Sequence, residues 1–452
     1  MKQIKLSNTL SKQKDIFTPQ EDKKVSMYVC GITPYDYAHI GHGRVAVTFD
    51  LLLRLLKLLG YQVTYVRNFT DIDDKLIARA QKEYGDENKF KDVATKFINA
   101  FTEDVQNLNC LKPDFEPLVT ENINDIILFV EGLLKNKKAY IKGRDVYFDI
   151  STFSDYGKLS GRNLEDLLAG ARIDVDEDKK NPQDFALWKG NDKSLFWISP
   201  WGHGRPGWHI ECSALAKKFL GETIDIHGGG MDLIFPHHEN EIAQSEGLTC
   251  KPFAKYWLHN AFVNINKEKM SKSLGNFFTL RDIFAKFDPM VLRFYYLQHQ
   301  FRSPIEFSFD DLEAAKKAYK KLIDVFFVDG GYHLSLENSK NFEKEIETDG
   351  LISQMLEAVC DDLNSPKMLG ILFENLNEIK NDPKLKNLIG KFLFNLTGLT
   401  FEKLPEESVV ITREIQELIA KREEARKQKN WALADQIRDQ LLSMGIEVRD
   451  KK

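Results

Sequence analysis

The sequence contains little cysteine and no long apolar segment, and both absences restrict the class of protein. There are five cysteines in 452 residues, an odd number spread widely along the chain. This usage argues against a disulfide framework and favours reduced thiols or metal ligands. The longest apolar stretch, residues 45–59, contains Asp50, Arg54 and Lys57, so it is too short and too polar to cross a bilayer.

The sequence also lacks a strong charge imbalance and a leader-like N-terminus. The formal net charge is -5, which neither indicates nor excludes a nucleic-acid partner, because such a partner needs only a local basic strip. Residues 1–15 mix lysine with polar residues and have no apolar core of a signal peptide, so we expect a cytoplasmic protein without a membrane partner. With 42% hydrophobic and 29% charged residues, the chain is expected to be globular. Its length predicts roughly two to four domains.

Alternating strand and helix patterns predict an α/β fold with a parallel sheet. Residues 25–31 form a short apolar run, residues 45–59 are apolar on most faces and stop at Gly60, and residues 61–68 are rich in β-branched and aromatic residues. A helix between two such strands is typical of a βαβ crossover in a Rossmann-like nucleotide-binding domain. Ligands bind such sheets at the carboxyl ends of the strands, where residues 30–42 are expected to lie.

A second α/β stretch follows at residues 208–265. Its pattern predicts helices at residues 208–220 and 237–246, which end at Gly221 and Gly247. It predicts strands at residues 223–227 and 257–265. Residues 116–205, between the two parts, have mixed character, and their charged patch at 174–180 indicates an exposed loop. We therefore interpret residues 116–205 as an insertion into the nucleotide fold.

The remainder of the chain is predicted to be an all-α helical bundle. From about Leu312 onward, apolar residues recur at three- and four-residue spacing, and glycine and proline become rarer. Residues 401–409 indicate a linker, because they combine a proline with acidic residues. Residues 412–443 then predict a helical hairpin hinged near Asn430.

Two short motifs point to nucleotide chemistry. The first is His39-Ile40-Gly41-His42, placed where a strand is expected to turn into a helix. A helix N-terminus offers unpaired backbone N–H groups and a positive dipole end, which suit phosphate, and Gly41 would let adenine approach the backbone closely. Taken alone, the string more often marks two ordinary histidines at a turn.

The second motif is Lys269-Met270-Ser271-Lys272-Ser273. A loop with two lysines and two hydroxyls can wrap polyphosphate, and lysine can stabilise the negative charge that develops as pyrophosphate leaves. Taken alone, this segment is more often an exposed basic loop. Both motifs in this order are very unlikely by chance, so their combination favours a nucleotide site.

Metal-ligand residue types occur at Cys30, at a predicted strand end, and on predicted helices that could converge at the same sheet edge, at Cys212, His237, His238, Glu239 and Glu241. His237 and Glu241 lie four apart on a predicted helix, so they share one face and can bind one ion. Two sulfurs, one imidazole and one carboxylate make a plausible zinc set. The spacing is not that of a zinc finger, each cysteine alone is more often a plain buried thiol, and spacing leaves His238 and Glu239 open as competing ligands.

The two nucleotide motifs resemble the two signatures of class I aminoacyl-tRNA synthetases. Within that class, most of the chain resembles cysteinyl-tRNA synthetases, from about residue 20 to residue 450. The residues that carry this resemblance are the runs Cys30–His42, Gly204–Cys212, His227–Gly230 and Pro236–Glu241.

The resemblance implies an enzyme that uses ATP with Mg²⁺ to activate L-cysteine as an adenylate and then transfers it to a cysteine-specific tRNA. It implies one zinc ion bound by Cys30, Cys212, His237 and Glu241, with the substrate thiolate as an added ligand. It further implies that Thr70, Trp208 and His227 line the amino-acid pocket. Catalysis is assigned to His39, His42, Lys269 and Lys272, and ATP binding to His39, Gly41, His42 and Lys272.

The resemblance also implies a domain order and a monomer. The expected catalytic domain consists of residues 1–115 and 206–260, separated by a connective insertion at 116–205. A junction at 261–311 carries the lysine motif and contacts the tRNA stem. A helical bundle at 312–404 and an anticodon-binding hairpin at 405–452 follow. Basic residues at 421–429 and the neighbouring Trp431 could contact RNA, although a solvated amphipathic helix has the same pattern.

Two other functions compete with this one. A relative that joins cysteine to an amino-sugar acceptor would use the same adenylate but would need no anticodon-binding end, and the basic hairpin counts against it. A non-catalytic tRNA-binding or zinc-scaffold relative would not need the complete set of His39, His42, Lys269 and Lys272.

Overall fold

The structure is a computed structural model that forms two compact units, residues 1–402 and 403–452, which are treated separately. It describes residues 2–162, 179–191, 196–265, 268–269, 277–332, 349–405, 413–428 and 430–443. None of the helices in these ranges is long and apolar enough to span a membrane.

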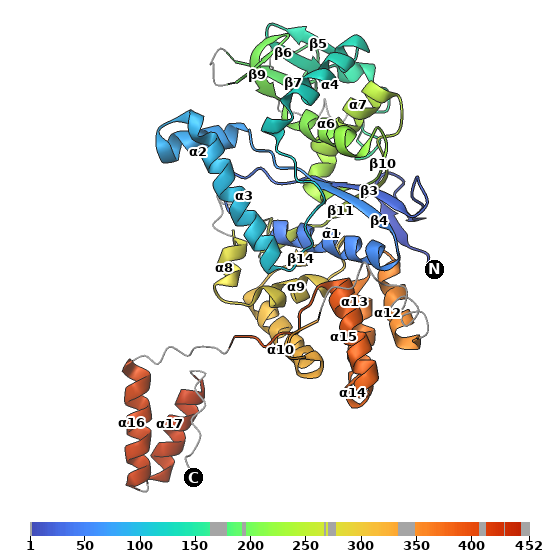
Figure 1. The fold of residues 1–452 in the computed structure, drawn as a ribbon. Helices are drawn as coiled ribbons and strands as arrows, with labels where there is room; N and C mark the ends of the chain where they lie inside the picture. The colour runs from blue at the N-terminus through green and yellow to red at the C-terminus, as the bar shows by residue number, and fades with distance from the viewer. Residues whose placement is uncertain are drawn as a thin grey trace. The chain divides into compact units, whose positions relative to one another are not determined.

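A four-stranded parallel sheet organises the first unit (Figure 1). Its strands are β3 (Lys24–Val29), β4 (Gln62–Arg67), β10 (Ile224–Gly230) and β11 (Ala254–Asn260), in the order β11-β10-β3-β4. Neighbouring strands are all parallel. The predicted parallel α/β sheet is therefore confirmed, and it is assembled from two stretches of sequence that lie far apart.

Helices cover both faces of this sheet (Figure 1). Helix α1 (Ile40–Leu58) packs on β4, β10 and β11, and α6 (Trp208–Leu220) packs on β3 and β4. The leucine-rich part of α1 is buried nearly all round, as expected of a helix held between a sheet and other helices. Helix α1 begins at Ile40 rather than Val45, because the His39 side chain caps its first turn.

Two further predictions of element boundaries were wrong. Helix α7 spans Glu239–Thr249 and ends at Cys250, which adopts a left-handed conformation, whereas Gly247 lies inside the helix against Lys138 and Phe148. The strand predicted at 257–265 is two strands, β11 and β12 (Val263–Ile265), because the chain leaves the main sheet after Asn260 and joins another one.

A five-stranded antiparallel sheet lies within the segment predicted as an insertion. Its order is β5-β6-β7-β9-β8, formed by β5 (Ala139–Lys142), β6 (Asp145–Phe148), β7 (Phe185–Gly190), β8 (Trp197–Ser199) and β9 (Gly202–Pro206). Three α-helices lie between β4 and β5: α2 (Asp74–Tyr84), α3 (Phe90–Asn107) and α4 (Ile123–Lys135). Most of the charged patch predicted as an exposed loop, residues 174–178, is outside the described residues.

The first unit also contains small sheets and a group of helices. The hairpin of β1 (Lys5–Asn8) and β2 (Gln13–Ile16) opens the chain, and β12 pairs with β13 (Glu268–Lys269) and β14 (Ile305–Glu306). The helices after β13 are α8 (Leu280–Phe284), α9 (Pro289–Leu297), α10 (Phe309–Phe326), α12 (Gly350–Cys360), α13 (Ser365–Glu374), α14 (Leu376–Asn381) and α15 (Pro383–Thr397). This run of helices confirms the prediction of a helical C-terminal part.

The second unit contains α16 (Arg413–Lys427) and α17 (Trp431–Ser443), which pack on each other. Helix α16 ends at Lys427 and α17 begins at Trp431, so the predicted helical hairpin with a hinge near Asn430 is confirmed. Its buried contacts come from Ile437 and Leu441 of α17, which pack against Leu418 and Ile419 of α16.

A buried charge network joins α1 to the helices that follow the sheet. The Asp50 carboxylate accepts hydrogen bonds from Arg54 Nε at 2.7 Å, from Arg293 Nη2, and from the Leu111 backbone N–H at 2.7 Å. The two guanidiniums donate in turn to carbonyl oxygens near the end of α15, with Arg54 reaching Asn395 at 3.3 Å and Arg293 reaching Thr397 at 2.5 Å. Burial raises the pKa of Asp50, but the charges of Arg54 and Arg293 outweigh it and hold that pKa below its ordinary value.

We predict that Asp50→Asn strongly destabilises the first unit. Two guanidiniums would remain buried without their common counter-ion, a situation that costs about 3–5 kcal/mol. Denaturant unfolding monitored by circular dichroism should show this loss. The matched control is Asp92→Asn, which removes an exposed carboxylate from a surface pair with Lys89 and should leave unfolding nearly unchanged. Equal stability of the two variants would contradict the role given to the network.

Candidate functional site

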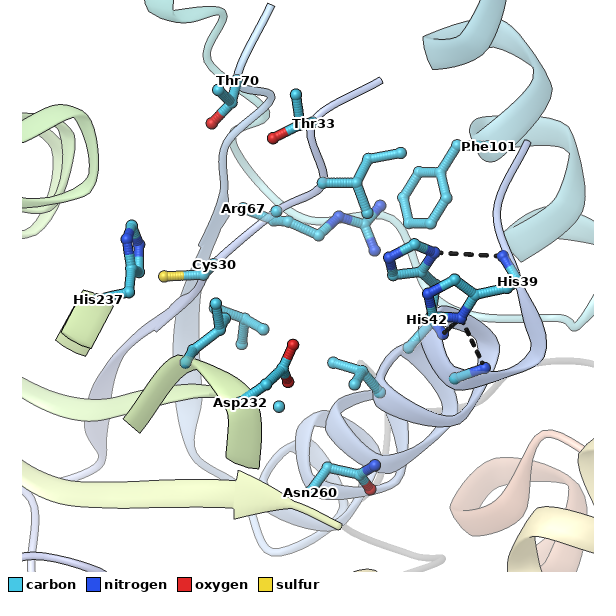
Figure 2. Close-up of a pocket in the computed structure, with 18 of the residues that line it drawn as sticks. Cys30, Thr33, His39, His42, Arg67, Thr70, Phe101, Asp232, His237 and Asn260 are labelled. Carbon is cyan, nitrogen blue, oxygen red and sulfur yellow. Dashed lines mark hydrogen bonds between the residues drawn. The ribbon is translucent and has the colours of Figure 1, made fainter. Parts of the chain in front are cut away.

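A cavity of about 650 Å³ opens where the four parallel strands end. Its lining includes Cys30 after β3, Arg67 at the end of β4, Gly230 at the end of β10 and Asn260 at the end of β11. The cavity thus lies at the carboxyl edge of the sheet, the edge at which ligand binding was predicted. In Figure 2 the Cys30 sulfur and the His237 ring face each other on one side of the cavity, and the His39 and His42 rings lie on the other.

The His39-Ile40-Gly41-His42 motif forms the first turn of α1. His39 Nδ1 accepts hydrogen bonds from the Gly41 and His42 backbone N–H groups at 3.1 and 3.3 Å, and His42 Nδ1 accepts from the His39 backbone N–H at 3.2 Å (Figure 2). The two rings stack with centroids 3.7 Å apart. This reciprocal cap fixes both imidazoles on the cavity wall.

These bonds determine which ring nitrogens can carry protons. A backbone N–H can only donate, so Nδ1 of each ring must be an acceptor, and the proton of a neutral ring then lies on Nε2. Burial, followed by the charge of His39, lowers the pKa of His42 well below its ordinary value, so the His42 ring is neutral at physiological pH. Each ring therefore presents an N–H donor at Nε2.

The expectation of unpaired backbone N–H groups at this helix start was wrong. The Ile40 N–H donates to Phe278 O at 3.2 Å, and the Gly41 and His42 N–H groups donate to His39. The imidazoles occupy the position in which an anion would otherwise meet the backbone. Any phosphate chemistry here must therefore use side-chain donors rather than the backbone N–H groups of the first turn.

The second signature is only partly within the described residues. Lys269 lies in β13, but its side chain and residues 270–276, including Lys272, are outside the described part of the chain. The segment just after them is well defined, since Leu280 N donates to Ala38 O at 2.8 Å and His39 forms a bridge with Thr279. The chain that follows the second motif is thus bonded directly to the first motif.

A cluster of thiols, imidazoles and a carboxylate lies at the other end of the cavity. Cys30 Sγ is 3.7 Å from Cys212 Sγ and 3.4 Å from Glu241 Oε1, and His237 Nε2 is 3.1 Å from the same carboxylate oxygen. The potential ligand atoms of these four buried residues all lie within 4.8 Å of one another. The residue after β3, helix α6, the helical turn Ile234–His238 and the start of α7 therefore bring together the four residues that the family resemblance implied.

A second ligand set overlaps the first. Cys30, His227, His238 and Glu241 also place their ligand atoms within 4.8 Å of one another. In the first set, Cys30, Cys212 and His237 line the cavity, whereas Cys30 alone does so in the second. The first set is therefore the one that a molecule in the cavity can reach, and its two thiols are the ligands that zinc favours.

The electrostatics of the cluster favour thiolate and imidazolium in the metal-free chain. The hydrogen bond from Cys30 lowers the pKa of Cys212 to about 6. Burial lowers the pKa of His237, but the charge of Glu241 outweighs it and raises that pKa to about 10. Because metal binding requires a neutral imidazole, an incoming cation would displace the His237 proton.

The three residues expected in the amino-acid pocket lie in different places. Thr70 and Trp208 line the cavity, with the Thr70 hydroxyl donating to Glu211 Oε2 at 2.9 Å and the Trp208 ring 4.3 Å from His237. His227 is fully buried, stacks on Trp257 and bonds Glu241 Oε2 through Nε2 at 2.8 Å. It lies behind the cluster rather than on the cavity wall.

The remaining candidates and the residues missed by sequence reasoning surround the cluster. His238 Nε2 lies 3.3 Å from Cys30 Sγ, whereas Glu239 turns away and accepts from the Ser160 N–H at 2.8 Å. His209 Nδ1 lies 3.0 Å from His237 Nδ1, and His259 Nε2 lies 2.8 Å from His238 Nδ1. His209 lies within the run Gly204–Cys212 but was given no role, and no spacing rule connects His259 in β11 to a helix that precedes it.

Comparisons with known proteins agree with this geometry. Residues 16–317 match the family model of the class I (C) tRNA synthetase catalytic domain, and residues 410–452 match that of the cysteinyl-tRNA ligase anticodon binding domain. The chain is 47% identical to the cysteine–tRNA ligase of Geobacillus sp. (strain WCH70), covering 100% of this chain and 98% of the relative. It is 44% identical to that of Trichlorobacter lovleyi, covering 99% and 98%.

Solved structures show the same fold at greater distance. A Mycobacterium tuberculosis methionyl-tRNA synthetase in complex with methionyl-adenylate aligns with a TM-score of 0.55 at 13% identity, over 82% of this chain and 88% of that one. The fold and its first signature define a class I aminoacyl-tRNA synthetase. Within this class, the chain belongs to the cysteine–tRNA ligase family. It is an enzyme of tRNA aminoacylation.

We predict that Gly31→Ala damages the site. A Cβ atom on Gly31 would lie 1.5 Å from Asn68 O, so β3 and the residue after β4 would have to separate at the cavity edge. Such overpacking costs about 1–3 kcal/mol and should also lower the rate of cysteine activation. Thermal unfolding and pyrophosphate exchange would measure the two effects.

The control is Gly350→Ala, where a Cβ atom would meet nothing within 4 Å. It should be close to neutral in both measurements. A Gly31→Ala enzyme that matched the control would show that the close approach to Asn68 is unimportant.

Proposed function

We propose that this ligase joins L-cysteine to its cognate tRNA in two steps through a cysteinyl-adenylate, with ATP and Mg²⁺ as co-substrate and a zinc ion that selects the thiol. The observation that carries the proposal is a single cavity with the His39–His42 imidazoles at one end and the Cys30–Cys212–His237 donors at the other. ATP and a thiol-bearing amino acid bound at these two ends would meet between them.

In the first step, the cysteine carboxylate attacks the α-phosphate of ATP and pyrophosphate leaves. In the second, the terminal adenosine hydroxyl of tRNA takes the acyl group and AMP leaves. Little covalent chemistry falls to the protein, so positioning and charge stabilisation supply most of the rate. The described lining of the cavity contains groups suited to both tasks.

His39 and His42 are proposed to stabilise the negative charge that develops on the phosphates. Their Nε2–H groups are donors, and their Nδ1 atoms are held by backbone N–H groups, so neither ring has to reorganise during the reaction. Gly41 lies between them on the cavity wall, where it leaves room for the nucleotide. Lys269 and Lys272 are proposed to bind the leaving pyrophosphate as mobile positive charges.

Zinc fits the four donors of the first set. Cys30, Cys212, His237 and Glu241 would hold it, and two sulfurs bound at about 2.3 Å to one tetrahedral zinc lie about 3.8 Å apart. The Sγ–Sγ distance of 3.7 Å is close to that value. When bound, zinc supplies a Lewis-acidic centre that prefers a thiolate to a neutral hydroxyl.

This preference addresses the main selectivity problem of the enzyme. Serine differs from cysteine by one atom, and a pocket of ordinary contacts discriminates between near-isosteres by only about 100-fold. Thr70 and Trp208 line the cavity and are proposed to position the amino acid. His227 is proposed to act on the pocket indirectly, since it bonds Glu241 and thereby fixes the orientation of that ligand.

We propose the division into catalytic halves, insertion, junction, helical bundle and hairpin given above, with residues 405–452 reading the anticodon. The match of residues 410–452 to an anticodon-binding model supports tRNA, rather than an amino sugar, as the acceptor. A monomer that works in the cytoplasm, where tRNA and ATP are abundant, completes the proposal.

The reaction is tested by ATP–pyrophosphate exchange followed by tRNA charging. Cysteine should support exchange more than about 100-fold better than serine, which is beyond the reach of ordinary contacts. Chelation should remove most of the cysteine-dependent rate, and added tRNA should become charged. Equal exchange with both amino acids would refute selection by zinc, and exchange without charging would favour the amino-sugar reaction.

The ligand set is tested by metal content. We predict that Cys212→Ser binds at least tenfold less zinc, because a hydroxyl is a poor substitute for a thiolate. Cys360→Ser, which alters a buried thiol of α12, should retain the metal. Lys272→Ala should also retain it while activating cysteine far more slowly. Full zinc occupancy in Cys212→Ser, measured by mass spectrometry of the metal, would count against this ligand.

A further inference from the structure

We propose that Arg44 is a positioning residue for the activation reaction. Its side chain holds the segments that lead to the strand carrying Lys269 against the helix whose start carries His39 and His42. The proposal rests on the function proposed above for Lys269. It goes beyond that function because it assigns the alignment of the two signatures to a side chain that belongs to neither of them.

Arg44 directs its guanidinium at main-chain carbonyl groups. Its Nη1 donates to Ala261 O at 3.0 Å and Phe262 O at 2.9 Å, and its Nη2 donates to Gln300 O at 3.0 Å and Ser303 O at 2.6 Å. The residue is 1% exposed. Burial lowers the pKa of Arg44 to about 10, so it remains charged at physiological pH. A buried cation bonded to backbone carbonyls fixes the path of the chain.

These carbonyls belong to the two segments that lead into the small sheet. Residues 261–262 immediately precede β12, and residues 300–303 precede β14. Strand β12 pairs with β14 on one side and with β13 on the other, where Asn264 faces Lys269. Arg44 therefore holds the two strands that determine where β13, and with it the backbone of Lys269, is placed.

The residues that follow the second motif are hydrogen-bonded to the start of α1 and to the residue before its cap. Ile40 N donates to Phe278 O at 3.2 Å, Leu280 N donates to Ala38 O at 2.8 Å, and the Tyr296 hydroxyl donates to Ile40 O at 2.7 Å. Residues 38–44 thus hold the chain both before and after the second motif. In the upstream attachment Arg44 contributes four hydrogen bonds to backbone carbonyls, and Thr48 adds one to the Asn260 side chain, whereas the downstream attachment depends mainly on backbone bonds.

Arginine suits this role better than lysine. Its planar guanidinium has donors in a fixed fork, so one side chain can bridge two segments, whereas an ammonium group is a single compact charge. A displacement of about 1 Å in a positioned group can cost about 100-fold in rate. Arg44→Lys keeps the charge and loses the bridge, so it is the informative substitution.

The test measures pyrophosphate exchange at varied ATP and varied cysteine. Arg44→Lys should lower kcat/KM for ATP by about 10- to 100-fold, while KM for cysteine stays within about twofold and zinc content is unchanged. The matched control is Arg54→Lys in the same helix, also 1% exposed and also bonded to carbonyls, but at Asn395 and Asn109. It should affect stability without this ATP-specific loss.

A double-mutant cycle separates positioning from a general structural effect. If Arg44 acts through β13, Arg44→Lys should cost much less in a Lys269→Ala background than in the wild type. The proposal would be overturned if the losses in kcat/KM for ATP of the two single variants multiplied in the double variant, or if Arg44→Lys had a normal kcat/KM for ATP. A Lys269→Ala enzyme with normal kinetics would instead contradict the function proposed for Lys269.

Tyr296→Phe provides a second route if Arg44→Lys does not fold. It removes one hydroxyl that bonds Ile40 O at the downstream attachment. If the start of α1 positions the second motif, Tyr296→Phe should lower kcat/KM for ATP by less than Arg44→Lys does, again with little change in KM for cysteine. A rise in KM for cysteine as large as the loss in kcat/KM for ATP would indicate a general loss of structure and would count against the proposed role of Arg44.

Discussion

Parallel pairing between β3 and β10 is the interaction on which the site depends. It joins Met27 to Ile226 and Tyr28 to His227, and it continues past the strand end in the bond from Cys30 N to Gly228 O at 3.1 Å. Residues nearly two hundred positions apart in sequence thereby end at one edge of one sheet. The first signature and the donor cluster therefore share a cavity, because every strand of a parallel sheet delivers its carboxyl end to the same side.

The pairing also places ionisable side chains in the protein interior, where the burial of a charge is energetically unfavourable. Cys212, His237 and Glu241 are nearly inaccessible to water, and an isolated charge there would be strongly unfavourable. The residues instead satisfy one another: His227 and His237 both bond Glu241, and Cys30 bonds Cys212. A cluster that balances opposite charges without solvent resembles a preformed ligand set. His209 contacts His237 and would orient that ring toward a bound ion, whereas His259 contacts His238, which lies outside the first ligand set.

Sequence reasoning reached the elements and the motifs more readily than the contacts between them. The parallel strands, α6 and the C-terminal hairpin follow from apolar periodicity and glycine stops, which are local properties. The start of α1 was missed because its cap is an imidazole rather than a serine or aspartate. The split between β11 and β12 was missed because β12 pairs with β14, a tertiary contact that leaves no local sequence pattern. Helical spacing paired His237 with Glu241, but only the family resemblance singled out the set of four, because no spacing rule connects Cys30 and Cys212 to that pair. Arg44 and His259 gave no signal, because a side chain that bonds distant carbonyls or a distant ring leaves no local pattern.

Helix α1 connects these separate findings. Near its start, Arg44 holds the segments that lead to the lysine-bearing strand; further along, Asp50 and Arg54 hold the end of α15. Gln300, whose carbonyl accepts from Arg44, also donates through its side chain to Asp362 O in the turn between α12 and α13. A buried helix behaves as a rigid rod over this length, so attachments at its two halves constrain each other. The catalytic edge and the helices that follow the sheet are therefore fixed to one common element, so the placement of β13 relative to the start of α1 is a property of the whole first unit rather than of these two segments alone.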